Sequence, residues 1–118
     1  MDPIHETLKY LLASQLTRRY QEIVLKMPEI VLVGGGAKVA DVQQGVLLGY
    51  IDLCNEELLL HKCGQIPDPI WESWKSGIIA GNSLVAIKQV WKDLKKSDHY
   101  SELATFLKDN GVDVFKIG

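Results

Sequence analysis

Three consecutive glycines in the segment VLVGGGAKV form the strongest sequence signal for ligand binding. A strand, a glycine loop and a helix start often hold phosphate, because backbone N–H groups converge there. Lys38 follows Gly36 too closely for a P-loop, and Val39 occupies the third glycine position of the G-x-G-x-x-G pattern. No second strand is expected after the next helix. We therefore favour a connector between helices. The alternative hypothesis is a small nucleotide- or phosphate-binding protein that uses Gly34, Gly35, Gly36 and Lys38.

Residues that bind metals or transfer protons are present but dispersed. His5, His61 and His99 are isolated and show neither H-E-x-x-H nor paired Cys and His at metal-ligand spacing. We expect no metal site and no cofactor. Cys54 and Cys63 are nine residues apart on one predicted helix, where they point to opposite sides. A disulfide between them is therefore not expected.

The adjacent carboxylates Glu56 and Glu57 are the best candidates for acid–base chemistry, since burial raises the pKa of a glutamate. Glu56 falls on the polar stripe of its predicted helix. Glu57 lies about 100° further round, and we expect it to be half-buried against Arg18, Arg19 or a tryptophan N–H. A structural ion pair is favoured over catalysis. No serine lies in a G-x-S-x-G setting, so the sequence predicts no catalytic residue.

The elements that must position these residues are helices. Apolar residues at steps of three and four predict helices over 3–26, 38–63, 69–81 and about 84–95. Ser97 or Asp98 caps a last helix to Asn110, and Asn110–Gly111 is expected to stop it. The apolar residues of 3–26 are expected to form one stripe: Ile4, Leu8, Leu11, Leu12, Leu16, Tyr20, Ile23 and Val24. Apolar side chains cover more than half of the circumference of 38–63, which predicts the central helix.

Two short segments suit strands rather than helices. The β-branched residues of 29–33 and the alternation in 112–117 predict a minor two-stranded β element. The fold class is therefore mainly α: a compact bundle of about five helices, with residues 1–118 forming a single domain.

The segment CGQIPDPIWESWKSGI predicts the corner between two helices. Gly64 is placed to end the central helix in a left-handed conformation. Asp68 is expected to cap the next helix, with Pro69 at its first position. Trp71 and Trp74 then fill the space inside the corner. Further along, Gly77 and Gly81 would allow another helix to approach closely, or would end this helix near Gly81–Asn82. Ser83 is expected to cap the following helix.

Residues 50–109 resemble a loose family of small bacterial and phage-associated helical domains with no assigned function. The resemblance rests on Asn55–Glu56–Glu57, Gly64, Ile66, Trp71, Trp74, Gly77–Ile78 and Trp91. These residues are structural, so the resemblance implies a fold and no catalytic residue. Some members stand next to membrane helices, and this chain departs from them in having no such segment.

Composition narrows the functional classes. The chain has 118 residues, 47% hydrophobic and 24% charged, as in ordinary globular domains, and no apolar run approaches the roughly 20 residues that span a bilayer. The net charge of −2 gives no reason to expect nucleic acid. No signal peptide is visible, so we expect a cytoplasmic protein.

These observations favour a non-enzymatic protein–protein interaction or assembly module, such as an accessory protein of a phage or mobile element. The candidate interaction residues are Trp71, Trp74, Trp91, Leu12 and Ile79. The partner is another protein, and a homodimer through helices 3–26 and 69–81 is one form that the assembly would take.

Overall fold

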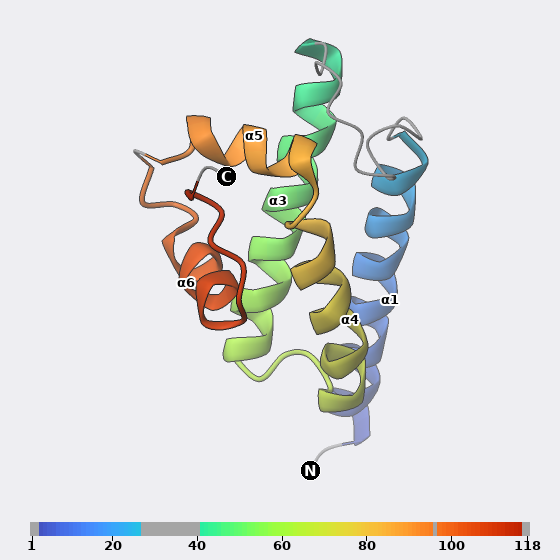
Figure 1. Cartoon of the computed structure of the whole chain (residues 1–118). Coiled ribbons are helices and arrows are strands. Elements are labelled where there is room, and N and C mark those ends of the chain that lie inside the picture. Colours follow the sequence, from blue (N-terminus) through green and yellow to red (C-terminus); the bar gives the residue numbers. More distant parts are fainter. Residues whose placement is uncertain (1–2, 27–40, 96, 117–118) are drawn as a thin grey trace.

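The computed structural model describes residues 3–26, 41–95 and 97–116, and within them the chain is a compact all-helical bundle (Figure 1). Its five helices are α1 (Pro3–Lys26), α3 (Asp41–Lys62), α4 (Asp68–Gly81), α5 (Val85–Asp93) and α6 (Ser101–Asp109). The predicted bundle of about five helices is confirmed.

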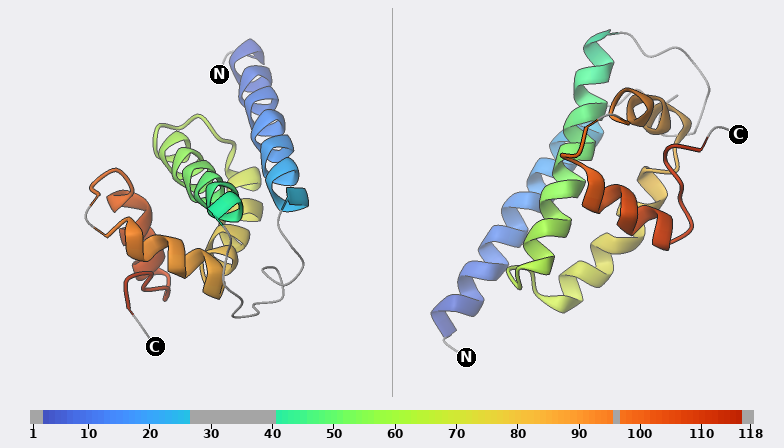
Figure 2. Two further views of the ribbon diagram at one scale, coloured as in Figure 1. Left: turned by 90° about the horizontal axis from the view of Figure 1, so that it is seen from above. Right: turned by 90° about the vertical axis from the view of Figure 1, so that its left-hand side faces the viewer.

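Helix α3 is the centre of the bundle, as its broad apolar surface predicts. Its backbone packs most closely against α1, α5 and α6. Figure 2 shows α1 at one edge of the molecule and α6 at the other, with α3 between them. The largest buried side chains of α3 point in several directions and include Leu47, Ile51, Leu53, Cys54 and Leu58. Burial on several sides therefore explains why this helix lacks a single apolar stripe.

The predicted β element is not present in the part of the chain that the structure describes. Residues 29–33 lie outside the described residues, and 112–116 form turns rather than a strand. Val112 donates its N–H to the carbonyl of Leu107 at 2.8 Å, and Phe115 donates its N–H to the Asp113 carboxylate at 3.1 Å. The hydrogen bonds of residues 112–116 are therefore local. The turns of this segment place the side chains of Val112 and Val114 against the core.

Glycines end two of the helices as the sequence predicts. Gly64 follows α3 with a φ of 74°, and Gly111 follows α6 with a φ of 90°. The N–H of Gln65 reaches back to the carbonyl of Leu60 at 2.9 Å, as in a Schellman motif. These left-handed positions strongly favour glycine, so the helix ends are encoded locally.

The predicted N-terminal caps are wrong. Pro67, Leu84 and Tyr100 hold the cap positions of α4, α5 and α6, and none of them makes a side-chain capping hydrogen bond. Asp68 is already helical. Ser83 donates its hydroxyl to the carbonyl of Ile79 at 2.9 Å, so it serves the end of α4 instead of the start of α5.

Candidate functional site

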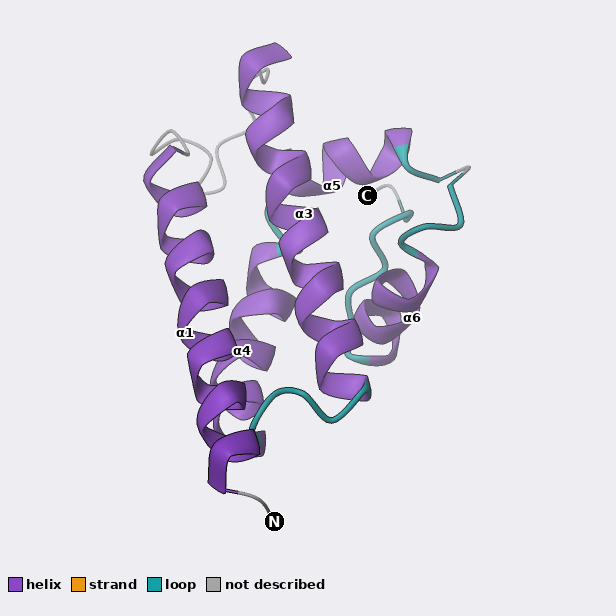
Figure 3. Cartoon of the chain, turned by 180° about the vertical axis from the view of Figure 1, so that it is seen from behind, coloured by secondary structure: helices purple, strands orange, loops and turns teal. Residues whose placement is uncertain are grey.

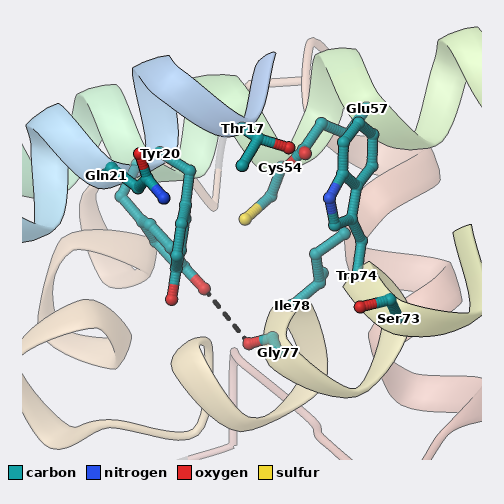
Figure 4. Close-up of a pocket in the computed structure, with 10 residues that line it drawn as sticks. Thr17, Tyr20, Gln21, Cys54, Glu57, Ser73, Trp74, Gly77 and Ile78 are labelled. Carbon is teal, nitrogen blue, oxygen red and sulfur yellow. Dashed lines mark hydrogen bonds between the residues drawn. The ribbon is translucent and has the colours of Figure 1, made fainter. Parts of the chain in front are cut away.

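A pocket of about 280 Å³ lies where α1, α3 and α4 meet. Figure 3 shows α4 crossing behind the space between α1 and α3, and Figure 4 shows the side chains that project into the pocket. We call it the Glu57 pocket. Its lining consists of Thr17, Tyr20, Gln21, Tyr50, Cys54, Glu57, Ser73, Trp74, Gly77 and Ile78. The lining therefore contains one carboxyl group and no basic side chain.

Glu57 is the most unusual residue of this pocket. Its side chain is only 4% exposed, yet it makes no hydrogen bond or ion pair with any other described residue. Burial raises the pKa of its carboxyl group to about 8; the neighbouring Glu56 adds to the rise and Arg19 opposes it. A buried carboxyl without a partner is costly to ionise, so Glu57 is largely protonated at neutral pH.

The ion pair expected for Glu57 is formed by its neighbour instead. Arg19 places a guanidinium nitrogen 2.8 Å from the carboxylate of Glu56. Both of those side chains are about half-exposed, whereas Glu57 lies 100° further round α3 and faces inward. The expectation that Glu57 is half-buried against Arg18, Arg19 or a tryptophan is therefore wrong.

Burial keeps Cys54 and Tyr50, which also line the pocket, neutral at physiological pH. Burial raises the pKa of the Cys54 thiol to about 12, and it raises the pKa of the Tyr50 phenol above its ordinary value. The Tyr50 hydroxyl donates to the carbonyl of Gly77 at 3.3 Å. Asn82 approaches the Cys54 sulfur at 3.7 Å. Cys54 is therefore poorly suited to act as a nucleophile, which requires the thiolate.

Aromatic rings form two sides of the pocket. The rings of Tyr20 and Tyr50 lie 6.2 Å apart between centroids, inclined at 50°. Trp74 stands across the pocket from Tyr20, and the Glu57 side chain runs towards Cys54 and Thr17 (Figure 4). The arrangement combines an acidic group with aromatic faces, a chemistry that suits a cation.

A second feature lies on the surface of α1. The predicted apolar stripe is only partly buried. Ala13 and Leu16 are buried against the rest of the bundle. Ile4, Leu8 and Leu11 have exposed fractions of 69%, 56% and 55%, and we call these three residues the outer face of α1. Because they are spaced i, i+4 and i+7, they form one continuous apolar surface.

The five candidate interaction residues are buried or half-buried within the single chain. Trp71 and Trp91 are buried, and Trp74, Leu12 and Ile79 are half-buried against the core. Trp71 stacks on His61 with ring centroids 4.2 Å apart. The two tryptophans nearest the chain corner therefore fill space between helices, and Trp74 alone also lines a pocket.

The Glu57 pocket was missed because its residues come from three helices. One signal was present: Tyr50, Cys54 and Glu57 are spaced i, i+4 and i+7, which places a carboxyl group on an otherwise apolar face. The glycine loop Gly34–Gly36 and Lys38 lie outside the described residues. Among the described residues, no group of three or more His, Cys, Asp and Glu side chains is arranged to hold a metal ion.

Comparison with known proteins finds no matching family model, no matching curated protein and no matching solved structure. None of the described helices is long and apolar enough to cross a membrane. The outer face of α1 and the Glu57 pocket are therefore the two features of the described chain from which we infer a function.

Proposed function

We propose that this protein is an assembly module that pairs with a second copy of itself through the outer face of α1. The observation that carries the proposal is the exposure of large apolar side chains on α1 outside its buried face. Leu8 and Leu11, each more than half-exposed, are the centre of this surface. Apolar area in contact with water favours association when a complementary surface is present.

The composition of the surface favours a second copy as the occupant. On the exposed side of α1, the residues around Leu8 are Pro3, Ile4, His5, Thr7, Leu11, Ser14 and Gln15, and among them His5 alone can carry a charge. A twofold axis places a surface against itself, so a charged surface would face its own charge. An antiparallel pair of α1 helices centred near Leu8 would pack Ile4 of one copy on Leu11 of the other without this repulsion.

Light scattering with size-exclusion chromatography tests the proposal. The chain has a mass of 13.2 kDa, and a dimer at micromolar concentration would show about twice that value. Leu8→Glu is expected to return the protein to a single-chain mass while its circular dichroism spectrum and melting temperature stay close to those of the wild type. A single-chain mass for the wild type would overturn the proposal.

Two further variants locate the interface. Leu25 is 85% exposed near the other end of α1, beyond the overlap expected in an antiparallel pair. Leu25→Glu is therefore the matched control and should leave the dimer intact. Leu12 is half-buried against the core, so Leu12→Glu should lower the melting temperature in addition to any change of mass. A dimer that survives Leu8→Glu would place the interface elsewhere.

A further inference from the structure

We infer that the Glu57 pocket is a binding site for an alkylammonium group, meaning a positively charged amine on a short apolar stem. The inference is independent of the dimer proposed above, because the pocket shares no residue with the outer face of α1. It combines the buried carboxyl group, the absence of any cation in the lining, and the aromatic walls.

Glu57 supplies the carboxyl group that would bind the positive charge of the ligand. Glu57 lines the pocket, is 4% exposed and has no hydrogen-bond or ion-pair partner among the described residues. Its carboxyl oxygens are not fully enclosed: in the described part of the chain, Asn55 Oδ1 is the one fully buried side-chain oxygen or nitrogen without a partner. A mostly buried carboxyl group that opens to a pocket is a candidate binding group. Arg19 does not pair with Glu57, because its guanidinium forms an ion pair with the carboxylate of Glu56 at 2.8 Å.

Aromatic and aliphatic side chains form the walls of the pocket. Tyr20, Tyr50 and Trp74 present aromatic rings to the pocket, and Ile78 adds an aliphatic side chain. Cations bind over aromatic faces, and recognition of ammonium groups by several aromatic rings is the best-known functional use of this attraction. An apolar stem would contact the same rings and Ile78.

Size and charge select among ligands. A volume of about 280 Å³ is at the lower end for ligand pockets and suits a small group rather than a nucleotide. A phosphate or carboxylate ligand is disfavoured, because it would lie beside the Glu57 carboxyl group and the lining contains no basic side chain to bind it. The same chemistry is available from a free small amine or from a lysine side chain of another protein, and these two sources require separate probes.

Binding of a cation must ionise Glu57. The carboxyl group is largely protonated below pH 8 in the empty pocket, so an ammonium ligand displaces its proton. The charged and titratable groups around it are Arg19 and Tyr20 from α1, and Tyr50, Cys54 and Glu56 from α3; the α4 residues that line the pocket carry none. Affinity should therefore rise about tenfold per pH unit between pH 6 and 7 and become constant above about pH 8.

Titration calorimetry and Trp74 fluorescence with three probes test the inference. The probes are n-butylamine, the neutral analogue n-butanol, and Nα-acetyl-lysine N-methylamide as a peptide lysine. The amines should bind saturably with the stated pH dependence and release a proton, and n-butanol should bind at least about tenfold more weakly. Tighter binding of n-butylamine indicates a free amine as the natural ligand, whereas tighter binding of the lysine probe indicates a protein side chain.

Glu57→Gln is the decisive variant, because it keeps the shape of the protonated carboxyl group. It should fold as the wild type does, lose at least about tenfold in affinity for the amines, and lose the pH dependence. Glu72→Gln is the matched control: Glu72 is exposed on α4 and does not line the pocket, so binding should persist. Equal amine binding by Glu57→Gln and the wild type would overturn the inference. So would equal affinity for n-butanol, or no saturable binding of either amine up to about 10 mM.

Discussion

The indole nitrogen of Trp91 donates a hydrogen bond to the side-chain oxygen of Asn82 at 2.9 Å, and neither residue is exposed to solvent. The amide nitrogen of Asn82 in turn donates to the carbonyl of Ile78 at 2.8 Å. Asn82 thus joins the end of α4 to the last turn of α5 in the core. A buried polar group with satisfied hydrogen bonds fixes the relative position of the elements that it joins.

Replacement of Asn82 by alanine should destabilise the protein by about 2–4 kcal/mol. The variant leaves the buried indole N–H of Trp91 without an acceptor and opens a small cavity. Urea denaturation followed by circular dichroism measures the free energy of unfolding. Asn110→Ala is the control, because Asn110 also bonds to the carbonyl four residues earlier, at 2.7 Å, but is exposed. A similar loss in both variants would show that the bond to Trp91 contributes little.

The close approach of α3 and α4 gives a second prediction. A Cβ atom added at Gly81 would collide with the phenol of Tyr50, whose ring is buried and bonded to Gly77. Gly81→Ala should therefore cost about 1–3 kcal/mol of unfolding free energy. A Cβ at Gly77, one turn earlier, meets no atom within 4 Å, so Gly77→Ala should stabilise the helix by about 0.5–1 kcal/mol.

A double-mutant cycle separates this collision from other effects of the substitution. Tyr50→Phe removes the hydroxyl oxygen, the atom nearest to the added Cβ. In that background Gly81→Ala should cost measurably less than in the wild type. An unchanged cost would attribute the loss to the backbone of Gly81 rather than to contact with Tyr50.

The helices and their glycine ends were predictable because both signals are local. Periodic apolar residues predict the helices, and Gly64 and Gly111 adopt the left-handed conformation that the sequence indicates. The N-terminal caps were not predictable by the same reasoning. Ser83 has two helix ends within reach, and its hydroxyl bonds to the end of α4. Residue type alone does not decide between such alternatives.

The two candidate functional features required the arrangement of helices in space. The apolar residues of α1 fit a helix, but spacing alone did not show that Leu8 stays exposed whereas Leu16 is buried. The sequence did single out Glu57 as a carboxylate near an apolar face. It could not show that Arg19 would pair with Glu56, because that choice depends on how α1 rotates against α3.

The raised pKa of Glu57 predicts how stability depends on pH. Below about pH 4.5 the carboxyl group is protonated in both the folded and the unfolded chain. As the pH rises towards 8, the unfolded chain ionises first, so the folded state loses stability by about 1.4 kcal/mol per pH unit until the folded carboxyl also ionises. Glu57→Gln removes this loss. The variant should therefore be more stable than the wild type by a few kcal/mol at pH 8 and nearly equal to it at pH 4.5.

Urea denaturation of both proteins at intervals between pH 4.5 and 9 measures this difference, and the contributions of the other carboxylates cancel in the comparison. The thiol of Cys54, with a pKa of about 12, does not titrate in this range. Glu72→Gln serves as the control, because Glu72 is exposed on α4 and does not line the pocket. It should retain most of the wild-type slope. If the curves of wild type and Glu57→Gln are parallel between pH 5 and 8, Glu57 ionises normally in the folded chain and water reaches its carboxyl group.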